Sequence, residues 1–153
     1  MVPLSWITNQ IAVSGAFSKE MIPFLKSKGI SAIIDVRSEY SDDRAFIENE
    51  GIKFMHVGID DCYCPTFGQL EEIFSFVIPL LDEGKKILVH CQNGCGRSPM
   101  IVVAILAKRG MNVADAIYLV EDKHPWTSFT LRQERFVYVE LDRYLSSENQ
   151  LEG

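Results

Sequence analysis

The sequence lacks the features that place a chain in or across a membrane. Its first residues, MVPLSWITNQ, show no basic region followed by an apolar one, the pattern of a secretory signal peptide. The longest strongly apolar run, Met100–Ala107, is far too short to cross a bilayer. We therefore expect a cytoplasmic protein with no membrane partner.

The sequence also has fewer basic residues than acidic ones. The 153 residues include 15 Lys and Arg against 21 Asp and Glu, which gives a net charge of −6. Nucleic acids and anionic membranes attract basic surfaces, so this balance argues against nucleic acid as a partner. It still leaves room for a local basic pocket.

Repeats, low-complexity tracts and linkers are absent as well. A chain of this length can bury a core of its own. We expect one domain over residues 1–146, followed by a polar, flexible tail over residues 147–153.

What the chain does contain is strand-like runs alternating with helix-like ones. The apolar runs 32–36 and 86–90 predict buried strands, the alternating run 53–59 predicts another strand, and short extended pieces cover residues 6–13. This alternation predicts an α/β fold, with a mostly parallel central sheet flanked by helices. The predicted helices cover residues 19–28 (capped by Ser18), 44–50, 69–82, 98–109, 113–122 and 131–145.

The four cysteines all fall in the middle of the chain. In a reducing compartment such a group indicates a reactive or metal site better than a disulfide framework. They are Cys62, Cys64, Cys91 and Cys95.

The clearest buried strand leads into the segment HCQNGCGRSP, residues 90–99. This loop follows the carboxyl end of a strand, where open α/β sheets bind ligands. If residues 92–97 curl around one point, their N–H groups form an anion cradle, and the next helix adds its positive N-terminus. Gly94 and Gly96 permit the dihedral angles of so tight a loop.

Cys91 stands at the base of this cradle. Nearby positive charge favours the thiolate, which is the nucleophilic form of cysteine. Arg97 can bind two phosphate oxygens with its planar fork, and Ser98 would donate a hydrogen bond to the sulfur. The segment therefore predicts phosphoryl transfer through Cys91 rather than an incidental glycine-containing turn. The predicted phosphate-binding residues are Gln92, Asn93, Gly94, Cys95, Gly96 and Arg97.

Residues 90–98 resemble the signature of the protein tyrosine phosphatase superfamily, H-C-x-x-G-x-x-R-[ST], and match every fixed position. The chain looks most like the small atypical dual-specificity phosphatases, from Ser5-Trp6 to Gln133-Glu134. This resemblance implies the cysteine-dependent phosphatase fold, with a sheet of four or five strands. It also implies a two-step reaction through phosphocysteine, without metal or other cofactor.

The resemblance also implies a general acid about thirty residues before the cysteine. Asp61 lies at that distance and is favoured over its neighbour Asp60. A carboxyl group suits this role because its proton affinity can be tuned toward the working pH. Gln133 stands where relatives orient the hydrolytic water, or it is a polar residue of the last helix. His90 is expected to hold the loop rather than to react.

The sequence departs from its relatives after residue 122. They often carry Arg-Pro-Gly where this chain has Lys123-His124-Pro125-Trp126. His124 is expected at the surface, and Trp126 either edges the site or packs on the core. Residues 37–43 are expected to form one wall of the substrate cleft, with Tyr40 as a candidate for substrate contact.

The remaining cysteines could serve in a zinc site or in a regulatory disulfide. Zinc is disfavoured because their spacing fits poorly with structural zinc sites and because metal would consume the nucleophile. A regulatory disulfide between Cys91 and Cys62, Cys64 or Cys95 is the better hypothesis, beside the alternative that these thiols have no role.

The expected function is hydrolysis of phosphotyrosine, with phosphoserine and phosphothreonine, in phosphorylated proteins by a monomer. The alternatives are a phosphatase of phosphoinositides, nucleotides or RNA 5′ ends, and a phosphopeptide-binding module that does not react. The loop has no lysine to meet extra phosphates, which disfavours phosphoinositides.

Overall fold

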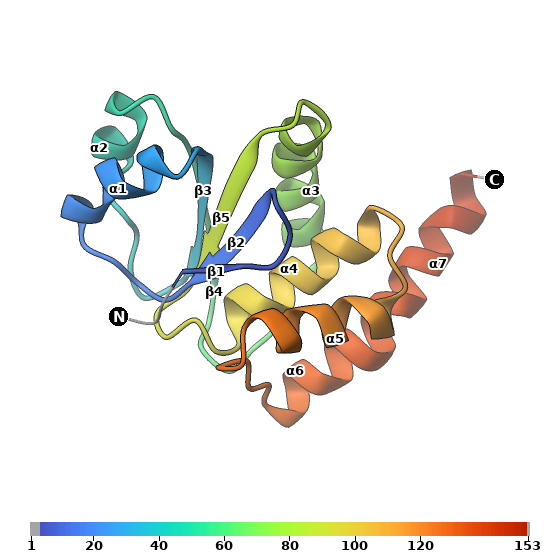
Figure 1. Ribbon diagram of the computed structural model, residues 1–153. Helices are drawn as coiled ribbons and strands as arrows, with labels where there is room; N and C mark the ends of the chain where they lie inside the picture. The colour runs from blue at the N-terminus through green and yellow to red at the C-terminus, as the bar shows by residue number, and fades with distance from the viewer. Residues whose placement is uncertain (1–3, 153) are drawn as a thin grey trace.

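The computed structural model describes residues 4–152, with side chains through Glu148. Five strands form one sheet in the order β1-β2-β5-β3-β4, with helices on both faces (Figure 1). β1 pairs antiparallel with β2, and the other neighbours are parallel. The predicted α/β fold is confirmed. The strands are β1 (Ser5–Trp6), β2 (Ile11–Ser14), β3 (Ile30–Arg37), β4 (Lys53–Ile59) and β5 (Lys86–His90).

The helices follow the predicted order closely. A 3₁₀ turn, η1 (Lys19–Met21), precedes the first helix, in which Pro23 stands in the first turn, and Ser18 makes no side-chain capping bond. The helices are α1 (Ile22–Ser27), α2 (Arg44–Asn49), α3 (Phe67–Asp82), α4 (Arg97–Lys108), α5 (Val113–Lys123), α6 (Leu131–Arg135), a π-helical turn η2 (Phe136–Glu140) and α7 (Leu141–Glu152).

The central strands are buried on both faces, which explains their continuous apolar runs. Side chains alternate along a strand, so Ile33 and Leu88 pack in one core cluster while Ile34 and Val89 pack in the other. Helices α1 and α2 lie over the first face, and α3 and α4 lie over the second (Figure 1). Residues 97–106 are all buried, so α4 is the central helix of the larger core.

The end of the chain differs from expectation. The structure has α6, η2 and α7 where one helix over residues 131–145 was predicted, and α7 continues through residues 147–152 instead of giving way to a loose tail. Two bonds hold its second half. Tyr144 and Lys108 both donate to the Glu148 carboxylate, at 2.9 and 3.1 Å.

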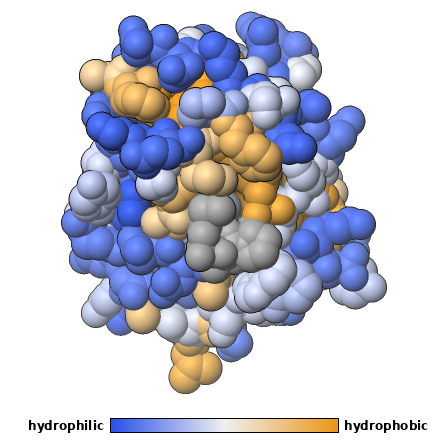
Figure 2. Space-filling model, turned by 60° about the vertical axis from the view of Figure 1, so that its left-hand side comes forward, coloured by the Kyte–Doolittle hydropathy of each residue, from blue (hydrophilic) through white to orange (hydrophobic). Residues whose placement is uncertain are grey.

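The face shown in Figure 2 is mainly polar, with apolar side chains gathered near its centre. Helix α1 has only six residues, and a hollow of about 430 Å³ lies beside it, lined in part by Trp6, Met21 and Phe24. No helix among residues 4–152 is long and apolar enough to cross a membrane.

Candidate active site

The loop between β5 and α4 lies at the carboxyl edge of the parallel strands, the lower edge in Figure 1. Cys91 is 2% exposed. Its Sγ lies 3.2 Å from the Ser98 hydroxyl and accepts the N–H of Gly94 at 3.3 Å. The chain therefore brings a hydroxyl and a loop amide to the sulfur, at the N-terminus of a buried helix.

Two glycines make the curl of this loop possible. Gly94 has a φ of +72°, and a Cβ there would lie 2.7 Å from the Gly15 nitrogen. A Cβ on Gly96 would lie 2.8 Å from Oε1 of Gln133. Any larger residue would push the loop away from β2 or from Gln133.

Arg97 is held by an acid that sequence reasoning missed. Glu39 accepts from Nη1 at 2.7 Å and from Nη2 at 2.8 Å, and the Ile59 carbonyl accepts from Nη1 at 2.9 Å. The hydrogen bond from Arg97 is the main cause that lowers the pKa of Glu39 to about 2, so this pair stays ionised at neutral pH. A single acid in a polar loop gave no pattern that could have identified it.

These bonds determine which part of Arg97 is available. A guanidinium has five N–H donors, and Glu39 and Ile59 use both on Nη1 and one on Nη2. The remaining two, on Nε and Nη2, share one edge of the planar group. That edge can bind two oxygens of a phosphate.

Asp61 lies beside this edge. Its Oδ1 is 3.7 Å from Nε of Arg97, and its side chain is 72% exposed. Oδ1 also accepts the N–H of Cys62 at 3.0 Å, which orients the carboxylate. The structure therefore brings Asp61 to the arginine, whereas no side-chain bond to the site is found for Asp60 among the described residues.

Gln133 connects the two loops of the site. It is 2% exposed, its Oε1 accepts from the Thr130 amide at 3.1 Å, and its Nε2 donates to the Tyr63 carbonyl at 3.2 Å. Its amide also lies against Gly96. Gln133 thus fixes the Asp61 loop beside the phosphate loop, a structural role that the sequence did not predict.

His90 belongs to a buried polar network. Its Nε2 contacts the Asp42 carboxylate, and its Nδ1 lies 3.2 Å from the Cys91 carbonyl. Arg37 bonds to Asp35 at 2.9 Å, to Asp42 at 3.1 Å and to the side chain of Gln92 at 2.9 Å. This network ties the end of β3 to the phosphate loop.

The loop after β3 forms part of a groove that reaches the site. The groove, of about 750 Å³, is lined in part by Arg37, Glu39, Tyr40 and Gln92. Tyr40 is 64% exposed and lies with its ring 4.8 Å from the Arg37 guanidinium. Trp126, 46% exposed, packs against the ring of His124. Asn93 is exposed on the loop itself.

Possible metal ligands come together once in the described part of the chain. Asp35, Asp42 and His90 place ligand atoms within 4.8 Å of one another. Arg37 already supplies a cation to both carboxylates, so these residues fit an internal ion pair better than a metal.

All four cysteines are free. Burial raises the pKa of the Cys95 thiol, and the negative charge of Cys91 adds to this effect. Burial also raises the pKa of Cys64. A smaller fraction of each of these two thiols is therefore ionised than of an ordinary cysteine at the same pH.

Residues 14–139 match the family described as "Dual specificity phosphatase, catalytic domain". Protein tyrosine phosphatase type IVA 3 of Bos taurus is 30% identical over 112 residues, which cover 72% of this chain and 64% of that protein. The putative tyrosine phosphatase 123R of Invertebrate iridescent virus 6 is 28% identical over 110 residues, covering 68% and 74%. The chain thus spans less than two thirds of the type IVA 3 relative.

Solved structures agree with this match. Tk-PTP in its active form is 26% identical with a TM-score of 0.79, over 94% of this chain and 96% of that one. PTPMT1 shares the fold at 18% identity, with a TM-score of 0.87 over 97% and 99%. The architecture is that of the cysteine-dependent protein tyrosine and dual-specificity phosphatases.

The family match includes the whole site, from Glu39 to Gln133, and covers well over half of the chain. The chain therefore belongs to the dual specificity phosphatase family.

Proposed function

We propose that the protein hydrolyses phosphotyrosine, and also phosphoserine and phosphothreonine, in phosphorylated proteins. The observation that carries this proposal is the position of Cys91. Its buried sulfur lies at the N-terminus of α4, within reach of Ser98, while two donors of Arg97 remain available for phosphate oxygens.

In the first step the Cys91 thiolate attacks phosphorus while the ester oxygen leaves and takes a proton from Asp61. In the second step Asp61 takes a proton from water, whose oxygen attacks phosphorus and breaks the S–P bond. Ser98 stabilises the returning thiolate, and Gln133 orients the water. The loop amides and Arg97 stabilise the charge on the phosphoryl oxygens in both steps, so no metal enters this scheme.

Protein substrates are supported by the relatives, which are named as tyrosine phosphatases. PTPMT1 has been solved with PI(5)P, but at 18% identity that likeness concerns the fold alone. The phosphate loop here carries no lysine to meet a second phosphate. The reaction also needs a reduced thiol, which supports a cytoplasmic location, and we propose that the enzyme acts as a monomer.

The first test is hydrolysis of p-nitrophenyl phosphate by the wild type and by Cys91→Ser, without added metal. We expect turnover by the wild type, none by the variant, and retained binding of tungstate by both. Full turnover by Cys91→Ser would contradict the proposed nucleophile.

A second test compares phosphopeptides, PI(5)P and RNA with a 5′ phosphate. We expect the highest kcat/KM on phosphopeptides. A higher kcat/KM on PI(5)P or on RNA would leave the proposed reaction mechanism intact but would overturn the proposed substrate class.

A further inference from the structure

A loop that points its amide hydrogens at an anion must point its carbonyl oxygens away, into the protein. Each buried carbonyl then needs a donor. In this structure the carbonyls of Gln92, Cys95 and Gly96 accept backbone N–H groups at 2.9, 2.7 and 3.0 Å. The donors are Ala16, Ser128 and Met100.

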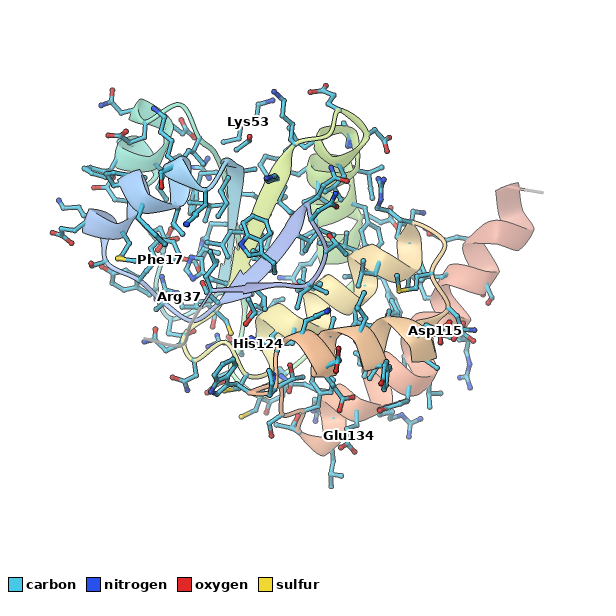
Figure 3. All side chains as sticks on the ribbon, in the orientation of Figure 1. Phe17, Arg37, Lys53, Asp115, His124 and Glu134 are labelled. Carbon is cyan, nitrogen blue, oxygen red and sulfur yellow. The ribbon has the colours of Figure 1, made fainter. Side chains whose placement is uncertain are left out.

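The carbonyl of Gly94 has a different partner. Nε2 of His124 lies 2.6 Å from it, although the two residues are 30 positions apart. His124 was expected at the surface, and this expectation is wrong, because its side chain is 0% exposed. The residue ends α5, which turns the ring toward the phosphate loop (Figure 3).

The second ring nitrogen is also bonded. Nδ1 lies 2.6 Å from the hydroxyl of Ser5 in β1. A carbonyl can only accept, so Nε2 must carry the hydrogen, and the Ser5 hydroxyl then donates to Nδ1. Burial lowers the pKa of His124, and the bond to Gly94 opposes this only in part, which favours the neutral ring.

The peptide that His124 holds follows a glycine, so it turns over more easily than a peptide between two residues with side chains. Gly94 has a φ of +72° and no side chain to oppose rotation. If the Gly94–Cys95 peptide flipped, its carbonyl oxygen would enter the cradle and the Cys95 N–H would leave it. The cradle would then meet a phosphate with a negative dipole instead of a donor.

We propose that His124 is a positioning residue that locks the Gly94–Cys95 peptide in its phosphate-binding orientation, with Ser5 selecting the required tautomer. This inference rests on the proposed phosphatase function. The ring itself is held in place by the backbone, since the His124 N–H donates to Val120 and the Thr127 hydroxyl donates to the His124 carbonyl, at 2.8 and 2.7 Å.

The test compares a substitution that removes the donor of His124 with one that keeps a donor. His124→Phe keeps a ring but has no donor, whereas His124→Gln can place an amide N–H near the position of Nε2. We expect His124→Phe to weaken tungstate binding and to lower kcat/KM on p-nitrophenyl phosphate by roughly tenfold or more. His124→Gln should recover most of both.

Lys123→Gln is the matched control, because it changes the neighbouring residue of α5, whose side chain is exposed, without touching the loop. We expect its tungstate affinity to equal that of the wild type. A direct readout is the NMR signal of the Cys95 amide, which should shift on tungstate binding in the wild type and in His124→Gln but not in His124→Phe.

Equal tungstate affinity in the wild type and a folded His124→Phe would overturn the inference, as would equal losses in His124→Phe and His124→Gln. If His124→Phe fails to fold, Ser5→Ala replaces it. Ser5→Ala removes the hydroxyl that bonds to Nδ1, so the hydrogen of the His124 ring is no longer confined to Nε2. We expect this variant to bind tungstate a few-fold more weakly than the wild type, and unchanged binding would overturn the inference. In each case an active wild type leaves the proposed function intact, whereas an inactive wild type contradicts that function itself.

Discussion

Cys91 and Asp61 occupy opposite environments. Cys91 is 2% exposed at the base of the loop, and the Asp61 side chain is 72% exposed near the guanidinium of Arg97. A bound phosphate ester would direct its leaving group away from the sulfur, toward the mouth of the pocket. The acid therefore belongs at the mouth, where it can meet both the leaving oxygen and the incoming water.

Replacing Asp61 by Asn should lower kcat on an alkyl phosphate by about 100-fold or more, the usual contribution of general acid–base catalysis. Asp60→Asn is the control, since Asp60 makes no side-chain bond to the site within the described residues. Steady-state kinetics on both variants decides the assignment. A larger loss in Asp60→Asn would show that the wrong carboxylate was chosen.

At the scale of single residues, the sequence predicted the site residues that lie together in one short segment of the chain. Cys91, Arg97 and Ser98 are close neighbours along the chain, so the motif alone places them together. Glu39 and His124 could not be predicted in their positions, because their partners lie 58 and 30 residues away. Only the fold brings a polar loop residue and a helix-ending histidine to the phosphate loop.

The segment after β3 acts as an element of the site because buried charges hold it. Arg37 is 4% exposed and Asp35 is 0% exposed, and Arg37 also bonds to Asp42, which contacts His90. Glu39 follows in the same segment. The network thus places the carboxylate that orients Arg97.

Glu39→Gln should raise KM by roughly fivefold, because a charge-assisted bond at a partly exposed site contributes about 1 kcal/mol after screening. The amide can accept one hydrogen bond from Arg97 but cannot balance its charge. KM for p-nitrophenyl phosphate measures the effect. A lower KM would indicate instead that Glu39 competes with phosphate for the guanidinium.

Asp35→Asn should destabilise the fold by roughly 3 kcal/mol, the cost of breaking a buried ion pair. Burial alone would raise the pKa of Asp35, but the hydrogen bonds and charges of Arg37 and the charge of His90 outweigh it and hold the pKa of this carboxyl below its usual range. As the pH falls, Asp35 therefore binds its proton at a higher pH in the unfolded state than in the folded state. This stabilisation is present above the unfolded pKa and is lost as the pH drops through the folded one.

Urea unfolding at neutral pH and below about pH 4 tests whether the stabilisation by Asp35 is lost on acidification. The wild type should lose stability on acidification by more than Asp35→Asn does. Equal acid sensitivity of the two proteins would contradict the role given to Asp35.

Among the elements, the buried strands were the most predictable. The run 86–90 coincides with β5, because a strand buried on both faces is apolar throughout, and the alternating run 53–59 coincides with the edge strand β4. The end of the chain was less predictable. Its polar residues gave no reason to extend the helix. Tyr144 bonds to Glu148 within α7, and the second bond to Glu148, from Lys108 of α4, depends on tertiary contact.

On the scale of the whole molecule, a net charge of −6 surrounds a site built to bind a dianion. The positive potential is therefore local, supplied by Arg97, the loop amides and the N-terminus of α4. Since these groups all belong to the chain, a chelator such as EDTA should leave the hydrolysis rate unchanged. A loss of activity that added metal restores would show that the proposed scheme is incomplete.

The central claim is that the loop holds a tetrahedral phosphate directly above the Cys91 sulfur. A crystal structure of the wild type with orthovanadate tests it most directly. We predict vanadium bonded to Sγ of Cys91, with its equatorial oxygens bound by loop amides and by Nε and Nη2 of Arg97. Vanadate bound away from the sulfur, or held by a metal instead of these donors, would contradict the account.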